Sequence, residues 1–160
     1  MTADLVSRPI RHLYVHVPFC GRRCSYCDFS IAVRREVPAA KFATSVASEL
    51  AGRTERVSLE DLDTVYFGGG TPSKLGPAGV TELLRRIRDT GVRLATDAEV
   101  TLEANPEDVS PAAAAAWLEA GVNRLSLGVQ SLAPEALSWM HRTHDAGQAL
   151  NAVRTVRSAG

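Results

Sequence analysis

Three cysteines lie in one short stretch, Cys20-Gly-Arg-Arg-Cys24-Ser-Tyr-Cys27, and the chain has no others. An odd number of thiols in a single loop is a poor disulfide framework and a good metal site. Thiolates are soft ligands that suit zinc and iron–sulfur clusters. A structural zinc ion normally has four protein ligands, and the nearest candidate for the fourth, His16, lies in a predicted strand before the loop. Three thiolates on a four-iron cluster instead leave one iron open to a small molecule. The ligand count therefore favours an iron–sulfur cluster with an open iron, with zinc as the alternative.

A glycine-rich turn, Gly68-Gly69-Gly70-Thr71-Pro72, follows a predicted strand. Glycines allow the backbone to approach a ligand closely and leave N–H and C=O groups free to bind it. Alone, this sequence indicates only a tight turn between a strand and a helix. Together with the cysteine loop, it indicates a ligand site.

Three further polar residues are candidates for ligand binding: Glu103, Gln130 and Arg142. A carboxylate, an amide and a guanidinium can together hold ribose hydroxyls, an ammonium group and a carboxylate. Each is weak evidence by itself, because an isolated glutamate or arginine is often a surface residue.

The hydrophobic pattern predicts strands that alternate with helices. The predicted strands are His12–Val17, Thr64–Phe67, Ala98–Ala104 and Asn123–Gly128. The first four predicted helices are Lys41–Leu50, residues 77–90, Ala112–Ala120 and residues 134–140, and Ser110 is expected to cap the third. A last helix is expected to begin after Asp145 as its cap. Its predicted apolar stripe is Leu150, Val153 and Val156. This alternation is typical of a parallel α/β sheet, here with about four strand–helix units.

The candidate residues follow the predicted strands in a regular way. The cysteine loop follows the first strand and the glycines follow the second, while Glu103 lies in the third and Gln130 follows the fourth. Parallel sheets bind ligands at the carboxyl ends of their strands. We therefore expect these residues to lie close together.

Composition indicates a globular domain, with 160 residues of which 45% are hydrophobic and 22% charged. The net charge of +0 gives no long-range attraction to nucleic acid, and the arginine clusters Arg22–Arg23, Arg34–Arg35 and Arg85–Arg88 are expected to be solvated faces. No apolar run is long enough for a membrane helix, and the first residues lack a secretory h-region. We therefore expect a cytoplasmic protein without an integral membrane segment.

The stretches YVHVPFCGRRCSYCDF, VYFGGGTPS, TLEANPEDV, NRLSLGVQS and MHRTH resemble, in order and spacing, one branch of the radical SAM superfamily. The resemblance implies a partial (β/α) barrel and a [4Fe–4S] cluster held by Cys20, Cys24 and Cys27. It also implies S-adenosylmethionine at the open iron, and a reduced cluster that cleaves its sulfonium to a 5′-deoxyadenosyl radical. The implied S-adenosylmethionine contacts are Tyr14, Tyr26, Gly69, Gly70, Thr71, Glu103, Gln130 and Arg142.

That branch contains oxygen-independent coproporphyrinogen III dehydrogenases and heme chaperones of the HemW type. The dehydrogenase pattern calls for a further cysteine two residues after the third ligand, where this chain has Phe29. The Cys-Asp-Phe sequence resembles the chaperones. The resemblance therefore implies heme binding and transfer to an acceptor protein, with oxidative decarboxylation of a porphyrinogen as the alternative. A small metal-binding module without S-adenosylmethionine is a second alternative.

The resemblance also implies that residues 1–160 are one radical SAM core domain that is truncated, since the remaining barrel units and the C-terminal domain with the heme motif lie beyond this stretch. None of the four histidines matches that motif. His16 is expected to be a structural histidine with satisfied ring nitrogens, and His141 and His144 are expected at the surface.

Overall fold

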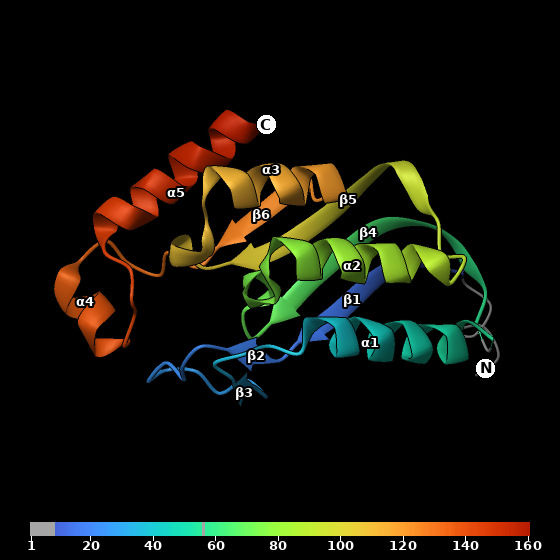
Figure 1. Cartoon of the computed structure of the whole chain (residues 1–160), viewed down its shortest axis with the longest axis horizontal. Coiled ribbons are helices and arrows are strands. Elements are labelled where there is room, and N and C mark those ends of the chain that lie inside the picture. The colour runs from blue at the N-terminus through green and yellow to red at the C-terminus, as the bar shows by residue number, and fades with distance from the viewer. Residues whose placement is uncertain (1–8, 56) are drawn as a thin grey trace, which may run out of the picture.

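The computed structural model describes residues 9–55 and 57–160, and its centre is a four-stranded parallel sheet with strand order β1-β4-β5-β6 (Figure 1). These strands are β1 (Ile10–Val17), β4 (Leu59–Gly69), β5 (Leu94–Ala104) and β6 (Arg124–Leu127). A second, two-stranded parallel sheet pairs β2 (Phe19–Cys20) with β3 (Ala32–Val33). Because the four main strands are parallel, their carboxyl ends meet at one edge of the sheet.

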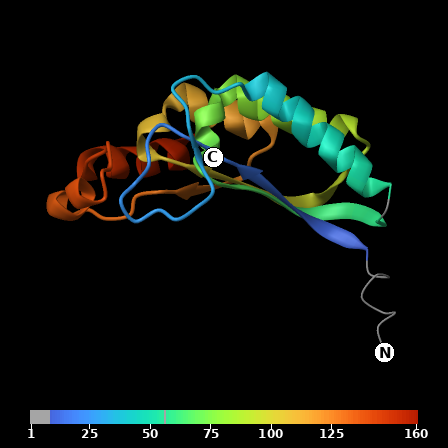
Figure 2. The same cartoon turned by 90° about the horizontal axis from the view of Figure 1, so that it is seen from below.

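Helices connect the strands and cover one face of the sheet. They are α1 (Ala39–Thr54), α2 (Gly76–Asp89), α3 (Pro111–Ala120), α4 (Pro134–Trp139) and α5 (Ala146–Ala159), with 3₁₀ turns η1 (Pro72–Leu75) and η2 (Pro106–Asp108). Figure 2 shows α1, α2 and α3 on the same side of the twisted sheet, whereas no helix of the described residues covers the opposite side.

The core lies between the sheet and these helices. Phe67 and Leu102 of the sheet pack in one buried cluster with Leu83 of α2 and Trp117 of α3. Full burial of a large apolar side chain contributes about 1.5–3 kcal/mol, so this layer holds the strand ends in place. The open face carries polar side chains instead, among them Tyr14 and Tyr66, whose rings stack with centroids 6.1 Å apart.

The capping residues expected from the sequence are found at both ends of α3 and at the start of α5. The hydroxyl of Ser110 accepts a hydrogen bond from the backbone N–H of Ala113 at the start of α3, and Gly121 ends that helix at a φ of 104°. Asp145 and Gln148 form a reciprocal capping box at the start of α5. These caps fix the loops that precede both helices.

The predicted order of strands and helices is confirmed, with shifts at the boundaries. β4 begins at Leu59 rather than Thr64, β5 begins at Leu94 rather than Ala98, and α1 extends beyond the predicted Lys41–Leu50 at both ends. The β2–β3 pair was not predicted, because strands of two residues are too short to show an alternating pattern.

The predicted apolar stripe of the last helix is wrong. α5 buries Ala149 and Ala152, while Leu150 and Val153 are exposed. The helix packs against α3 and η2 through small residues, which let two backbones approach closely. The larger side chains therefore face away from this contact.

In residues 9–55 and 57–160, no helix combines the length and the apolar character that a membrane span requires.

Replacement of Ser110 by alanine is expected to lower the free energy of unfolding by about 1 kcal/mol, because the N–H of Ala113 loses its acceptor. Denaturation by urea measures the change. Ser45→Ala is the matched control, since the Ser45 hydroxyl only bonds the carbonyl of Lys41 one turn earlier in α1. Equal losses in the two variants would contradict the capping role.

Candidate functional site

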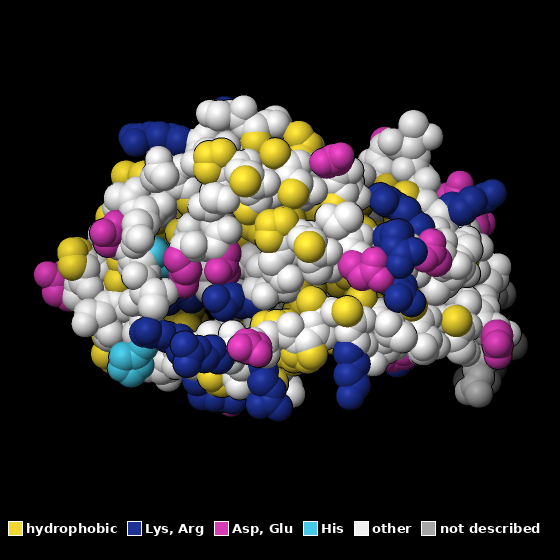
Figure 3. All heavy atoms as spheres, viewed as in Figure 1, with side chains coloured by type: hydrophobic (Ala, Val, Ile, Leu, Met, Phe, Trp, Pro, Cys, Tyr) yellow, Lys and Arg dark blue, Asp and Glu magenta, His cyan; other side chains and the backbone are white. Residues whose placement is uncertain are grey.

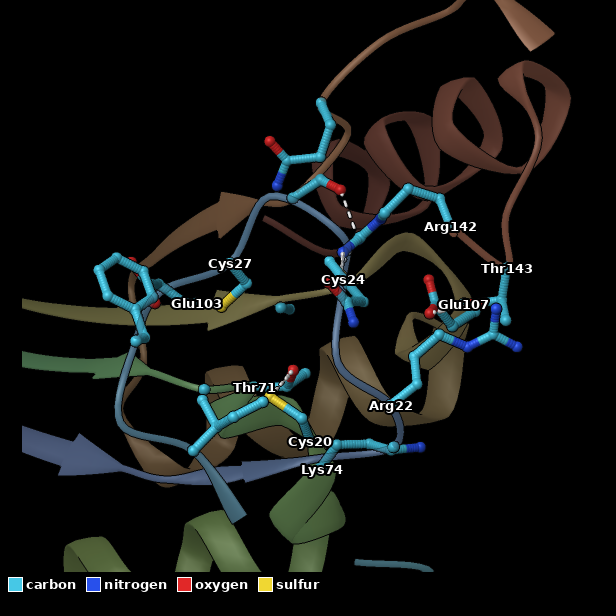
Figure 4. A pocket seen from close by; sticks show the side chains of 18 of the residues that line it. Cys20, Arg22, Cys24, Cys27, Thr71, Lys74, Glu103, Glu107, Arg142 and Thr143 are labelled. Carbon is cyan, nitrogen blue, oxygen red and sulfur yellow. Dashed lines mark hydrogen bonds between the residues drawn. The ribbon is translucent and has the colours of Figure 1, made fainter. Parts of the chain in front are cut away.

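A cavity of about 680 Å³ opens at the carboxyl ends of the main strands (Figure 4). Its walls come from the cysteine loop, the ends of β4, β5 and β6, and the segment that follows α4. Ten residues predicted from the sequence line it, namely Cys20, Cys24, Tyr26, Cys27, Gly69, Gly70, Thr71, Glu103, Gln130 and Arg142. The expected convergence is therefore found in the structure.

The cysteine loop runs from β2 to β3, and backbone hydrogen bonds hold both ends. The N–H of Ala32 donates to the carbonyl of Pro18 at 2.7 Å, and the N–H of Arg34 donates to the carbonyl of Cys20 at 2.9 Å. Between these ends, the N–H of Cys27 bonds the carbonyl of Cys24 in a turn. Both the second and the third thiol line the cavity.

Two side chains bind the same loop to the last residue of α4 and to the segment that follows it. A guanidinium N–H of Arg22 donates to the carbonyl of His141 at 2.9 Å, and the hydroxyl of Ser25 donates to the carbonyl of Trp139 at 2.7 Å. The loop is thereby fixed against residues more than one hundred positions later in the chain. These contacts close one wall of the cavity.

Hydrogen-bond donors lie beside two of the thiols. The Thr71 hydroxyl lies 3.4 Å from the sulfur of Cys20, and Nη1 of Arg142 lies 3.7 Å from the sulfur of Cys24. Burial raises the pKa of Cys20, as do the other two thiols, while the Thr71 hydrogen bond and the positive charge of Arg142 lower it. Burial outweighs Thr71 and Arg142, so the pKa of Cys20 lies above its ordinary value, and these two groups only partly offset the cost of forming the metal-binding thiolate.

The three thiols lie around the cavity rather than at one point. Figure 4 shows Cys20, Cys24 and Cys27 at separate positions on its wall. Within the residues that the structure describes, no three His, Cys, Asp or Glu side chains are grouped to hold a single metal ion.

The glycine-rich turn allows β4 to end directly against the exit of β1. Gly69 has a φ of 110°, and a Cβ there would lie 2.5 Å from the His16 ring. A Cβ on Gly70 would lie 2.8 Å from the backbone of Pro18. The N–H of Gly70 then donates to the carbonyl of Val17 at 2.8 Å. Side chains at these two positions would separate the strand ends.

Glu103 is held by two donors. Its carboxylate accepts a hydrogen bond from the Tyr66 hydroxyl at 2.7 Å and another from the N–H of Gly69 at 3.1 Å. The hydrogen bond to Glu103 raises the pKa of Tyr66, with burial as a second cause. Sequence reasoning missed Tyr66, which the alternation of β4 places on the same face as Glu103.

Arg142 is fixed by two acceptors besides the thiol of Cys24. Its Nη2 donates to the side-chain oxygen of Asn105 at 2.6 Å and to the carbonyl of Gly128 at 2.8 Å. The buried Nε has no partner among the described residues. Asn105 was also missed, although it immediately follows β5 at the edge where ligands bind.

Tyr14 is the one predicted site residue outside the cavity wall. Its side chain is 55% exposed on the open face of the sheet, stacks on Tyr66, and its hydroxyl bonds Nδ1 of His16 at 3.1 Å. Nε2 of His16 bonds the carbonyl of Ser30 at 3.0 Å, so the expectation of a structural histidine with both nitrogens satisfied is confirmed.

The expectation that His144 lies at the surface is wrong. The residue is 3% exposed, its Nε2 donates to the carbonyl of Val129 at 3.0 Å, and its Nδ1 lies 3.3 Å from a carboxylate oxygen of Glu107. Glu107 also accepts a hydrogen bond from Thr143. Burial raises the pKa of Glu107, but the Thr143 hydrogen bond and its other interactions outweigh burial and hold that pKa below its ordinary value. These contacts fix the backbone on both sides of Arg142.

Comparison with known proteins gives consistent matches. A family model described as the radical SAM superfamily matches residues 14–160. The heme chaperone HemW of Mycobacterium tuberculosis is 40% identical over 92% of this chain and 38% of its own length. HemW of Escherichia coli is 36% identical over 98% of this chain and 41% of its own length. The chain thus spans about two fifths of the length of these curated relatives.

Solved structures show the same fold. Coproporphyrinogen III oxidase (HemN) of Escherichia coli superposes with a TM-score of 0.85 and 27% identity, over 96% of this chain and 35% of that chain. Methylornithine synthase matches at a TM-score of 0.59 with 16% identity, over 93% of this chain and 42% of that chain, which supports the fold alone. From the family match over residues 14–160, together with the thiol-lined cavity, the chain belongs to the radical SAM superfamily.

Proposed function

We propose that Cys20, Cys24 and Cys27 hold a [4Fe–4S] cluster and that S-adenosylmethionine binds beside it in the cavity. The observation that carries this proposal is the shared cavity, because the three thiols line the same space as Glu103 and Arg142. Membership of the radical SAM superfamily implies both groups. Three thiolates also leave one iron without a protein ligand, which gives a small molecule a coordination position.

The residues present fit these groups. The donor set consists of three thiols with hydrogen-bond donors beside two of them, as thiolate ligands require. The buried Nε of Arg142 lacks a partner, and a carboxylate in the cavity would supply one. At Gly69 and Gly70 the backbone itself forms part of the cavity wall.

Each polar group has a separate role in this proposal. Glu103, whose orientation Tyr66 and Gly69 fix, takes the ammonium or a ribose hydroxyl of S-adenosylmethionine. Arg142 takes the carboxylate and stabilises the thiolate of Cys24. Tyr26 and Gln130 line the cavity and bind the remaining parts of the ligand. Tyr14 lies outside the cavity wall and takes part in this proposal only if the ligand extends to the open face, where Tyr14 stacks on Tyr66. When bound, the cluster supplies one-electron reduction of the sulfonium.

We further propose that the whole protein is a heme chaperone that transfers heme to an acceptor protein in the cytoplasm. Relatives from Mycobacterium tuberculosis and Escherichia coli are named as the heme chaperone HemW, at 40% and 36% identity. The position of Phe29 supports this choice over the dehydrogenase. Phe29 lines the cavity and is 65% exposed, at the site where the dehydrogenase pattern calls for a cysteine.

Oxidative decarboxylation of coproporphyrinogen III is the second candidate. The superposition on HemN at a TM-score of 0.85 favours it, because the arrangement of strands and helices is nearly the same. The similarity in sequence is lower for this structure, at 27%.

Replacement of Cys24 by alanine is expected to abolish cluster binding, since two thiolates do not retain a four-iron cluster. Anaerobic reconstitution followed by iron and sulfide analysis measures the loss. Ser25→Ala, in the same loop, is the control and is expected to keep the cluster, because its hydroxyl bonds only the carbonyl of Trp139. Full brown absorbance in Cys24→Ala, or stoichiometric zinc in the wild type, would refute the ligand assignment.

Replacement of Glu103 by alanine is expected to weaken S-adenosylmethionine binding by about tenfold or more while the cluster stays intact, because hydrogen bonds to a charged group contribute about 1.5–3 kcal/mol. Calorimetric titration measures the affinity, and the cluster absorbance reports integrity. Glu99→Ala is the control on the same face of β5, where Glu99 bonds Thr101. Unchanged affinity in Glu103→Ala would remove this residue from the site.

The full-length protein is expected to bind heme and to leave coproporphyrinogen III unchanged. Heme titration followed by absorbance and anaerobic product analysis by chromatography test the two parts. Formation of the divinyl product at many turnovers per cluster would show a dehydrogenase and would contradict the chaperone proposal.

A further inference from the structure

Backbone strain in the described residues is found beside the cavity. In residues 9–55 and 57–160, the non-glycine residues with a positive φ are Gln130, at 63°, and His141, at 56°, and both line the cavity. The left-handed region is unfavourable for a residue with a Cβ, so such a residue persists only where its surroundings hold it. Because Gln130 is a proposed contact of S-adenosylmethionine, the groups that hold its backbone bear on ligand binding.

The peptide unit that precedes Gln130 is held by two donors. The N–H of Ser131 donates to the carbonyl of Val129 at 2.7 Å, and Nε2 of His144 donates to the same oxygen at 3.0 Å. This carbonyl and the N–H of Gln130 belong to one planar peptide unit. The hydrogen bond from His144 therefore fixes the plane from which the backbone of Gln130 continues, and with it the left-handed conformation of that residue.

A second hydrogen bond joins the same two segments of the chain. Nη2 of Arg142 donates to the carbonyl of Gly128 at 2.8 Å, which is the carbonyl immediately before that of Val129. Arg142 and His144 thus donate to consecutive carbonyls of the loop that follows β6. Since Gln130 and Arg142 reach the cavity from these two segments, the two hydrogen bonds set their side chains relative to each other.

The buried ring of His144 is placed by η2. Its Nδ1 lies 3.3 Å from a carboxylate oxygen of Glu107, and the same carboxyl group accepts a hydrogen bond from Thr143. Figure 4 shows Glu107 and Thr143 facing each other beside Arg142. Asn105, the residue before η2, holds the guanidinium of Arg142 at 2.6 Å. One short 3₁₀ turn thus contacts both the arginine and the histidine.

η2 is in turn fixed to η1. The hydroxyl of Ser73 donates to the carboxylate of Asp108 at 2.7 Å, and the ammonium of Lys74 lies 3.5 Å from that carboxylate. The N–H of Asn105 donates to the oxygen of Ser73 at 3.3 Å. Figure 3 shows acidic side chains next to a Lys or Arg side chain in this region, between α4 and α2. The position of the His144 ring is therefore determined by the folded protein before any ligand binds.

We propose that His144 is a positioning residue for S-adenosylmethionine. Its Nε2–H holds the carbonyl of Val129, and this contact keeps Gln130 in the left-handed conformation that places its side chain on the cavity wall. The inference rests on the proposed ligand site. His144 itself does not line the cavity, so it acts through Gln130 and not by contact with the ligand. The role requires a donor at the position of Nε2, because a carbonyl oxygen only accepts.

The test compares two variants of the full-length protein whose new side chains have the same length. His144→Gln keeps an N–H donor near the position of Nε2, whereas His144→Met fills a similar space without a donor. After cluster reconstitution, calorimetric titration measures the affinity for S-adenosylmethionine, and the electron paramagnetic resonance of the reduced cluster follows the same titration. Val122→Ala is the control, because Val122 is equally buried but precedes β6, at the end of the strand opposite the cavity.

His144→Met is expected to bind S-adenosylmethionine about fivefold or more weakly than the wild type, because one hydrogen bond that positions the site is lost. His144→Gln is expected to match the wild type. Val122→Ala is expected to lower stability and to leave the affinity unchanged. When Gln130→Ala is already present, His144→Met is expected to cause no further loss of affinity, because the side chain that His144 positions is gone. Cluster content should be equal in all variants.

Equal affinity in His144→Gln and His144→Met would overturn the proposal, and so would losses that simply add in the double variant with Gln130→Ala. If His144→Met does not fold, His144→Asn takes its place, because its amide lies near the position of Nδ1 and does not reach the carbonyl of Val129. Wild-type affinity in His144→Asn would also overturn the proposal.

A wild-type protein that takes up the cluster but binds no S-adenosylmethionine refutes the proposed function instead. Amide hydrogen exchange at Ser131, measured without ligand, separates the two failures, because the N–H of Ser131 shares the carbonyl of Val129 with His144. Faster exchange in His144→Met than in His144→Gln supports the positioning contact whatever the ligand is. Equal exchange in the two variants would show that His144 does not hold this turn.

Discussion

The close approach of the β4 end to the β1 exit determines the rest of the site. Gly69 and Gly70 allow this approach because a Cβ at either position would overlap His16 or the backbone of Pro18. The same turn presents the N–H of Gly69 to Glu103 and the hydroxyl of Thr71 to the sulfur of Cys20. One backbone constraint thus orients a carboxylate on β5 and supports a thiol on β2. Without it, the strand ends would separate and neither contact could form.

A second constraint acts from the far end of the chain. Arg142 reaches across the cavity, where Asn105 and the carbonyl of Gly128 hold its guanidinium beside Cys24. Buried His144, whose ring lies 3.3 Å from the partly exposed carboxylate of Glu107, fixes the backbone around it. The cavity therefore has the Glu103 carboxylate beside the glycine turn on one side and the Arg142 guanidinium on the other. These opposite charges suit a ligand that carries both an ammonium and a carboxylate group.

Much of this arrangement could be predicted from the sequence, for identifiable reasons. Alternating strands and helices bring strand ends to one edge, so Cys20, Gly69 and Glu103 were expected together and are found together. Tyr66 and Asn105 were missed because their roles depend on the pairing of strands distant in sequence. His144 was misplaced because local sequence around Arg142 gives no sign of burial against η2. The prediction that Leu150, Val153 and Val156 form the packing face of α5 was wrong, because the helix packs closely through Ala149 and Ala152 instead.

The two hydrogen bonds from the cysteine loop to the segment after α4 affect how the protein assembles. Arg22 and Ser25 bond residues 119 and 114 positions later. A ribosome makes the loop well before its anchor, so the thiols lack these two supports while the residues in between are synthesised. The arrangement of the loop therefore depends on a segment that is translated much later, since both supports form only after β6 and α4 have been made.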